Sequence, residues 1–356
     1  MTFILIVILV ALVFEYINGF HDTANAIATS VSTKVLTPRQ AIILSTFFNL
    51  VGALAGTAVA KTIGAGLVDT QFITLTTIMC ALLGAIAWNL LTWWFGIPSS
   101  SSHALVGGLC GAAVASAQNN FQVINWVTHD TVKHQWTGLL PKVIIPMVAA
   151  PIIGLLVGFL VMGLLLLVLR GWKPHTVNVF FRPAQWVSAA WMSFSHGTND
   201  AQKTMGIIAL TLFTATTKTH AFDNLPHWLD FLHTPKFDIH TWVKFVCALT
   251  MAAGTAAGGW RIIKTLGNKL VKMQPVHGFA AQSTAAMVIE AATHWGIPLS
   301  TTHVITAAIL GVGATKRLNA VKWPVMFNIV IAWVLTLPVT AGLAYGIAYI
   351  AHWLGA

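Results

Sequence analysis

Eight apolar runs, each long enough to cross a bilayer, restrict the folds open to this 356-residue chain. They begin near residues 2, 41, 71, 142, 184, 242, 275 and 321. A run of about 20 apolar residues is the length that spans the hydrocarbon core as a helix. Only 8% of the residues are charged, against about 25% in an average soluble domain, which excludes a soluble enzyme. We therefore expect an all-α polytopic membrane protein.

Two of the apolar runs are interrupted by nearly the same polar sequence, 200 residues apart. Residues 96–103 read Gly-Ile-Pro-Ser-Ser-Ser-Ser-His, and residues 296–303 read Gly-Ile-Pro-Leu-Ser-Thr-Thr-His. A Gly-x-Pro break ends one helix, and the Ser or Thr that follows caps the start of the next. No charge or long polar loop separates the halves of either run. We predict two re-entrant helical hairpins whose tips lie inside the membrane.

A second pair of related sequences lies upstream of the hairpins. Residues 19–25 read Gly-Phe-His-Asp-Thr-Ala-Asn, and residues 197–203 read Gly-Thr-Asn-Asp-Ala-Gln-Lys. The chain is therefore an internal duplication, with an N-terminal transmembrane repeat over 1–175 and a C-terminal repeat over 176–356. Duplication in an apolar chain is typical of transporters, whose sites are formed by broken helices. We expect the glycines to break the helices that carry Asp22 and Asp200.

The distribution of charge predicts how the repeats thread the membrane. We place the N-terminus outside and arrange each repeat as span, span, hairpin, span. The inside loops then hold twelve basic residues and no acidic one, whereas the outside loops hold six basic and five acidic residues. Because basic residues favour the cytoplasmic side, both termini are expected outside a plasma (inner) membrane, with the two repeats inverted. The net charge of +10 then reflects this bias and lipid contact, not a nucleic-acid partner.

Four acidic residues lie within apolar segments: Glu15, Asp22, Asp200 and Glu290. A charge near the bilayer centre costs about 2.5–3.5 kcal/mol on insertion scales, so four of them are not incidental. Structural pairing is an open alternative for each, and Asp200 can be neutralised by Lys203, three residues along a helix. Asp22 and Asp200 occupy equivalent positions in the two repeats, which favours a functional role for this pair.

The hairpin tips carry the groups expected to bind an anion. Free backbone N–H groups, positive helix ends and several hydroxyls form a site for a small tetrahedral oxyanion. Two nearby carboxylates would repel such an anion unless a coupling cation or proton intervenes, or unless a carboxylate accepts a hydrogen bond from the ligand. Phosphate keeps an O–H at neutral pH and sulfate does not, so the carboxylates favour phosphate. The tip hydroxyls belong to Ser100, Ser101, Ser102, Ser300, Thr301 and Thr302.

Two further polar residues of the repeated sequences complete this candidate site. Lys203 can contact phosphate directly or hold Asp200 in place, and Asn25, its repeat counterpart, can donate a hydrogen bond without charge. Histidines also adjoin the four motifs and titrate near physiological pH. They can relay protons or touch a metal–phosphate complex, or, as neutral rings, satisfy helix-end carbonyls. These are His21, His103, His196 and His303.

The repeated Gly-x-x-Asp sequences, paired with the two Ser/Thr tips, resemble the inorganic phosphate transporter (PiT) family over essentially the whole chain. The resemblance implies a cation-coupled phosphate symporter with inverted repeats, commonly dimeric. It also implies a phosphate-binding role for Asp22, Asn25, Ser100, Ser101, Asp200, Ser300, Thr301 and Thr302.

The first repeated sequence differs from its counterpart in the sodium-coupled members of that family. Those members tend to have Asn-Asp in both of the repeated sequences. This chain has Asn199 before Asp200 but His21 before Asp22. The His21 form resembles the bacterial low-affinity, proton-coupled branch, which is thought to carry phosphate with a divalent metal.

We therefore expect a secondary active transporter, not an enzyme, that imports inorganic phosphate, alone or as a metal–phosphate complex, by symport with protons. A sodium-coupled phosphate symporter and a sulfate permease on the same scaffold are the alternatives. We expect a homodimer and no cofactor, and we assign no set of metal ligands. The coupling ion is expected at His21, Asp22, Asn199, Asp200 and Glu290.

Overall fold

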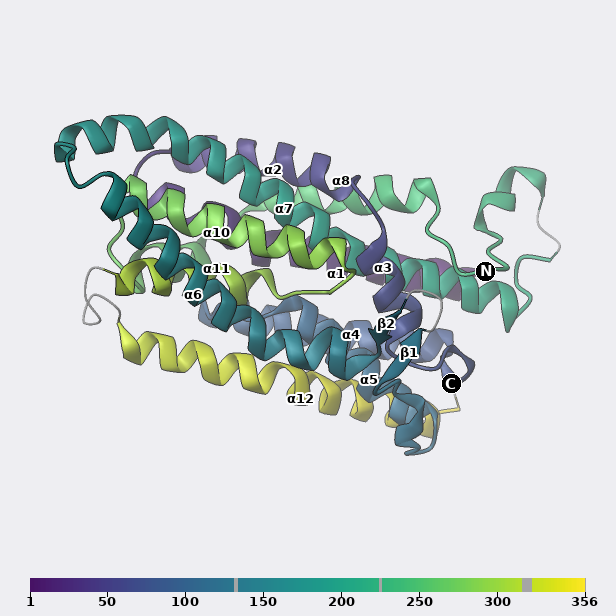
Figure 1. Cartoon of the computed structure of the whole chain (residues 1–356). Coiled ribbons are helices and arrows are strands. Elements are labelled where there is room, and N and C mark those ends of the chain that lie inside the picture. Colours follow the sequence, from purple (N-terminus) through teal and green to yellow (C-terminus); the bar gives the residue numbers. More distant parts are fainter. Residues whose placement is uncertain (131–133, 224–225, 316–321, 356) are drawn as a thin grey trace.

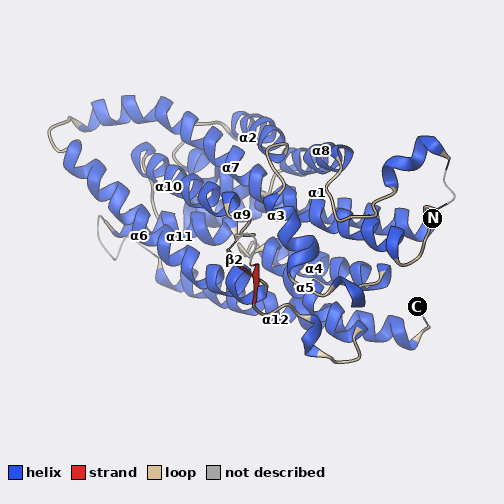
Figure 2. Ribbon diagram, turned by 45° about the vertical axis from the view of Figure 1, so that its right-hand side comes forward, coloured by secondary structure: helices blue, strands red, loops and turns tan. Residues whose placement is uncertain are grey.

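The structure, a computed structural model, describes residues 1–130, 134–223, 226–315 and 322–355. These residues are almost entirely helical, apart from a small antiparallel pair formed by β1 (Thr128–Asp130) and β2 (Gln135–Thr137) (Figure 2). The α-helices are α1 (Thr2–Ser32), α2 (Pro38–Ala53), α3 (Ala58–Lys61), α4 (Leu75–Phe95), α5 (Ser101–Ser116), α6 (Ile145–Val168), α7 (Pro174–Thr217), α8 (Thr241–Ala257), α9 (Trp260–Lys264), α10 (Pro275–His294), α11 (Thr301–Ala314) and α12 (Trp323–Trp353).

Several of these helices are long and apolar enough to cross a membrane. Among the described residues, α1, α4 and α12 qualify singly, as does Leu140–Val168, which is α6 with the π-helical turn η4 (Leu140–Ile144) before it. Two bent pairs qualify when each is taken as one span: α2 with α3 and η1 (Thr62–Gly66), and α8 with α9 and η6 (Thr265–Lys269). This composition supports the expected multi-pass membrane protein.

The two predicted hairpins are confirmed. Helices α4 and α5 pack together, as do α10 and α11. Gly96 and Gly296 adopt left-handed backbone conformations, with φ of 65° and 63°, where the first helix of each hairpin ends, as expected for glycine at a helix C-terminus. Ser100 and Ser300 then cap the second helices, because their hydroxyls accept hydrogen bonds from N–H groups three residues later.

The helices that carry Asp22 and Asp200 are continuous, so the expectation that glycines break them is wrong. Gly19 of α1 lies against the backbone of α8, and Gly197 of α7 lies against the backbone of Asn49 in α2. Each glycine allows two buried helices to approach closely without interrupting its own helix. The breaks occur instead between α2 and α3, bent by 65°, and between α8 and α9, bent by 58°.

The two halves of the sequence are intertwined. Helix α5 packs on α12 and α11 packs on α6, while α1 packs on α8 and α7 on α2 (Figure 1). Consequently both hydrophobic cores contain residues from both halves. The exchange brings the two hairpins together in the middle of the bundle, while the chain termini lie at the same end (Figure 1).

Candidate functional site

The predicted phosphate-binding residues converge in the interior, where the two hairpin tips meet. The hydroxyl of Ser102 in the first tip donates a 3.1 Å hydrogen bond to the carbonyl of Leu299 in the second. The rings of His103 and His303 lie 4.9 Å apart behind the tips. The site residues are no more than 3% exposed: Asp22, Asn25, Ser100, Ser101, Ser102, Asp200, Lys203, Ser300, Thr301 and Thr302.

Lys203 of α7 connects three parts of this site. Its ammonium group forms an ion pair with Asp200 and donates to the hydroxyl of Ser102. It also donates a 3.0 Å hydrogen bond to the carbonyl oxygen of Leu299. Lys203 therefore neutralises Asp200 and touches the two tips, while its direct contact with phosphate stays a prediction.

The second tip bridges the two carboxylates. Thr301 Oγ1 donates to Asp200 Oδ2 at 3.1 Å, and Thr302 Oγ1 lies 3.5 Å from Asp22 Oδ1. The Asn25 side-chain amide donates to both threonine hydroxyls, at 3.1 and 2.8 Å. These contacts bring the repeated Asp residues of α1 and α7 to one side of the tips, as the sequence duplication predicts.

Some polar atoms at the site are buried without a hydrogen-bond partner among the described residues. They include Ser101 Oγ in the first tip and Asn25 Oδ1 in α1. A buried hydroxyl normally has a partner, so these atoms are available to a ligand. Ser101 Oγ lies at the start of α5, where N–H groups at the positive helix end favour an anion.

His21 links the first carboxylate to the first tip. Its Nδ1 lies 2.6 Å from Asp22 Oδ1, and its Nε2 lies 3.1 Å from the hydroxyl of Thr92 in α4. Thr92 in turn accepts a 2.9 Å hydrogen bond from Ser99. A chain of hydrogen-bond contacts therefore connects Asp22 to Ser99, which precedes α5.

His196, one of the four histidines considered for proton relay or metal contact, lies beside the two carboxylates. Asp22, His196 and Asp200 are buried and offer ligand atoms within 4.8 Å of one another. His196 Nε2 lies 3.1 Å from Asp200 Oδ2 but is not aligned for a hydrogen bond, while Nδ1 contacts Asn49 Oδ1 at 3.0 Å. Two carboxylates and an imidazole are donors suited to a divalent metal. The signal in the sequence is that His196 lies one helical turn before Asp200.

Two residues expected at the coupling site are placed elsewhere. Glu290 is half-buried and accepts hydrogen bonds from Trp191 Nε1 at 2.8 Å and Ser195 Oγ at 2.9 Å. The Asn199 amide donates to Thr293 Oγ1 at 2.8 Å and to the carbonyl of Ile297 at 3.2 Å. Both residues therefore connect α7 to the second hairpin.

The structure also shows supports for the tips that sequence reasoning missed. Thr62 and Thr265 donate to the carbonyls of Gly296 and Gly96, at 2.7 and 2.8 Å. Lys142 is one of the six basic residues expected in the outside loops, but it is buried at the start of the span Leu140–Val168 and donates to the carbonyl of Trp295 at 2.7 Å. No local pattern marks these residues, because each partner lies more than 150 positions away.

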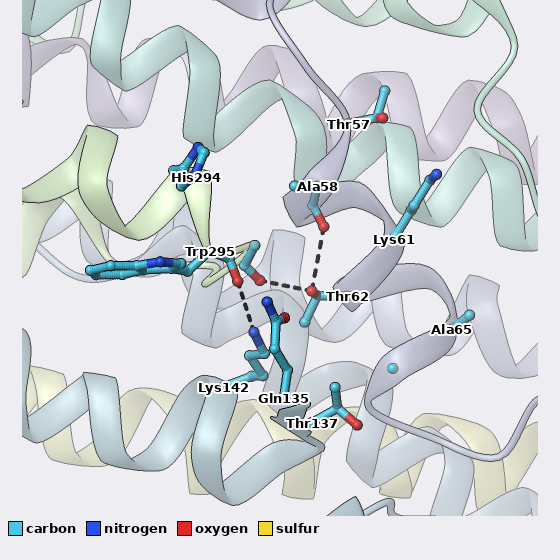
Figure 3. Close-up of a pocket in the computed structure, with 12 residues that line it drawn as sticks. Thr57, Ala58, Lys61, Thr62, Ala65, Gln135, Thr137, Lys142, His294 and Trp295 are labelled. Carbon is cyan, nitrogen blue, oxygen red and sulfur yellow. Dashed lines mark hydrogen bonds between the residues drawn. The ribbon is translucent and has the colours of Figure 1, made fainter. Parts of the chain in front are cut away.

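A cavity of about 610 Å³ adjoins the second tip on the side of the β-hairpin (Figure 3). Basic side chains around it include Lys61, Lys142 and His294, and its inner wall is formed by Trp295 and Gly296. None of the phosphate-site residues lines this cavity. The cavity therefore reaches Gly296 before the second tip without reaching the aspartates and tip hydroxyls, which are buried in this conformation.

Comparisons with known proteins agree with this architecture. The model of the phosphate transporter family matches residues 18–175 and 169–344. A probable low-affinity inorganic phosphate transporter of Bacillus subtilis (strain 168) is 46% identical, covering 97% of this chain and 96% of the relative. A protein of Rhizobium meliloti (strain 1021) with the same description is 45% identical, covering 94% and 92%.

A solved structure shares the fold. A chain described as the sodium-dependent phosphate transporter superposes with a TM-score of 0.84, covering 99% of this chain and all of that chain, at 23% identity. At this identity the likeness supports the fold alone. The family match and the sequence identities above, which extend over nearly the whole chain, support the family. The chain is a multi-pass membrane transporter, not an enzyme, and it belongs to the phosphate transporter family, as the resemblance to PiT proteins predicts.

Proposed function

We propose that this protein imports inorganic phosphate by symport with protons across a plasma (inner) membrane, with both termini outside. The observation that carries the proposal is the meeting of two buried helix N-termini, Lys203 and the tip hydroxyls beside Asp22 and Asp200. Oriented N–H groups, hydroxyls and one ammonium group suit an oxyanion. The sequence relatives are described as low-affinity phosphate transporters, which supports this choice of anion.

The two carboxylates favour phosphate over sulfate. Monohydrogen phosphate presents an O–H that a carboxylate oxygen accepts, whereas sulfate has none at neutral pH. Bound sulfate would donate no hydrogen bond to the carboxylates, and its negative charge would repel theirs. Both effects are costly in a buried site. Asp22 is the better acceptor for this O–H, because Asp200 is already paired with Lys203.

Asp22 and Asp200 also couple the anion to a cation in this proposal. When Asp22 is protonated, with His21 at 2.6 Å, it donates a hydrogen bond to a phosphate oxygen instead of accepting one from the phosphate O–H. The negative charge beside the bound phosphate is then removed. The donor set of Asp22, His196 and Asp200 additionally fits a divalent metal carried as cargo with phosphate. Inverted repeats would then open the enclosed site to each side in turn.

The proposal is tested by uptake of radiolabelled phosphate into proteoliposomes under an inward proton gradient, without sodium. We expect uptake that a protonophore abolishes and that excess sulfate does not inhibit. Uptake that begins only when sodium is added would overturn the proton coupling and retain the phosphate site. Inhibition by sulfate as strong as that by unlabelled phosphate would overturn the choice of anion.

Two companion measurements use the same purified protein. Radiolabelled manganese supplied with phosphate should enter in proportion to the phosphate, and unchanged phosphate uptake after complete chelation of divalent ions would show that metal is not required. The molar mass in detergent distinguishes the proposed homodimer from a monomer.

A further inference from the structure

Glu15 is a buried carboxylate that the phosphate site does not use. It lies on α1 seven residues before Asp22, about 10 Å along the helix axis, and its exposed fraction is 0%. Both of its hydrogen bonds reach the same oxygen: Thr204 Oγ1 donates to Oε2 at 2.5 Å, and Asn18 Nδ2 donates to Oε2 at 3.4 Å. Oε1 has no partner among the described residues.

The charges around Glu15 do not neutralise it. The titratable groups that act on it are Asp200 and Lys203 of α7 and the Cys247 thiol of α8. Lys203 is already paired with Asp200 and directed at the two tips. Helix α4, which also packs on α1, carries no charged residue. An ionised carboxylate with one bare oxygen is costly in such surroundings, whereas a proton on it removes the charge.

Asn18 is suited to partner either protonation state. Its amide oxygen also lacks a hydrogen-bond partner among the described residues. An amide turned by half a rotation places oxygen where nitrogen now stands. The ionised Glu15 then accepts from the amide nitrogen, and the protonated Glu15 donates to the amide oxygen. Neither state requires a movement of the backbone.

We propose that Glu15 is a proton-binding site of the transport cycle, separate from the phosphate site and linked to it through α7. The link is short, because Thr204, which donates to Glu15, directly follows Lys203 in the helix. One proton adds to the carboxylate from the outer solution, and it leaves to the inner solution after phosphate is released. Only an O–H bond forms and breaks. This inference rests on the proposed proton symport.

Protonation of Glu15 should strengthen phosphate binding. When Glu15 loses its negative charge, the ammonium group of Lys203 interacts electrostatically with Asp200 and the bound anion alone. The electrostatic potential at the phosphate site then becomes more positive. By thermodynamic reciprocity, bound phosphate must raise the proton affinity of Glu15 by the same factor. Proton and phosphate then load together, which is the requirement for symport.

The test compares E15Q with the control D230N in proteoliposomes. Asp230 is an exposed carboxylate outside the apolar segments, and it pairs with His227 at 3.0 Å. We expect E15Q to keep phosphate counterflow, measured without gradients, within about two-fold of wild type. It should lose accumulation driven by an inward proton gradient, whereas D230N should keep both activities. Normal proton-driven accumulation by E15Q would overturn the assignment.

Failure of the proposed function is distinguishable from failure of this inference. If wild type itself shows no proton-driven accumulation, the proton symport is wrong whatever the variants do. If wild type accumulates phosphate and E15Q does so equally, only the role of Glu15 is wrong. An independent measurement is the number of protons taken up when phosphate is added to detergent-solubilised protein in weak buffer. In E15Q this number should fall by nearly one proton per bound phosphate.

T204V keeps the proposal testable where E15Q does not fold. Valine has nearly the shape of threonine but removes the hydroxyl that stabilises the ionised form of Glu15. Glu15 should then keep its proton to higher pH, so the pH profile of phosphate accumulation should shift to higher pH. A profile identical to that of wild type would contradict the proposal.

Discussion

Thr62 supports the second hairpin tip from the other half of the chain, because its hydroxyl donates a 2.7 Å hydrogen bond to the carbonyl of Gly296. Thr265 makes the matching 2.8 Å bond to the carbonyl of Gly96 in the first tip. Both glycines lie where a helix ends, and carbonyls there lack an intrahelical partner. Each tip is therefore held by the bent helix pair from the other half of the chain.

Replacing either threonine with valine should destabilise the protein by similar amounts. T62V and T265V each remove a hydroxyl donor from a tip carbonyl, which costs about 1–3 kcal/mol when the remaining group is buried. Unfolding in micelles, followed by circular dichroism, measures the change, and T2V at an exposed position is the control. Stabilities equal to that of T2V would show that these bonds do not support the tips.

D22N should abolish proton-driven phosphate uptake while the protein still inserts in the membrane. Asparagine keeps the size of the side chain and its contacts with His21 and Thr302, but it cannot bind and release a proton. Proteoliposome uptake measures the loss, and the yield of purified protein reports insertion. The control D223N alters an exposed aspartate that pairs with His220. Normal proton-driven uptake by D22N would remove Asp22 from the coupling mechanism.

Ser100 and Ser101 of the first tip should respond differently to alanine. Ser101 Oγ has no partner among the described residues, so S101A should weaken phosphate binding by about 0.5–3 kcal/mol, the range for hydrogen bonds to neutral and charged groups. Ser100 caps α5 through the N–H of His103 at 3.1 Å, so S100A should also lower stability by about 1 kcal/mol. Calorimetric titration with phosphate and thermal unfolding separate the two effects. Unchanged affinity in the double variant would place the anion elsewhere.

K203M should destabilise the fold more than any single tip variant. It removes the cation paired with a fully buried Asp200, and the loss of one partner from a buried ion pair typically costs about 3–5 kcal/mol. The double variant K203M/D200N removes both charges and should recover most of that stability, while phosphate transport stays absent. Chemical unfolding in micelles measures the difference. A single variant as stable as the double one would show that the pair is not coupled.

Local sequence signals were sufficient for the spans and the hairpins. Apolar runs predicted the helices, and the Gly-Ile-Pro sequences before Ser100 and Ser300 predicted where each hairpin turns. These features depend on backbone conformation and capping within a few residues, so they can be read from neighbouring positions. The repeated Asp22 and Asp200 likewise predicted a shared site, because duplication places equivalent residues at equivalent depths. The inverted orientation of the repeats stays a prediction.

What only the tertiary structure decided is how distant residues meet. Gly19 and Gly197 do not break their helices; each instead lets a neighbouring helix approach closely. His196 joins the two aspartates, while Glu290 turns to Trp191 and Ser195. These outcomes arise because helices from the two halves exchange partners, so each buried polar group bonds with residues far away in the chain. The sequence by itself determined the helices and the chemistry of the candidate site, and the exchange of helices decided which of those groups share it.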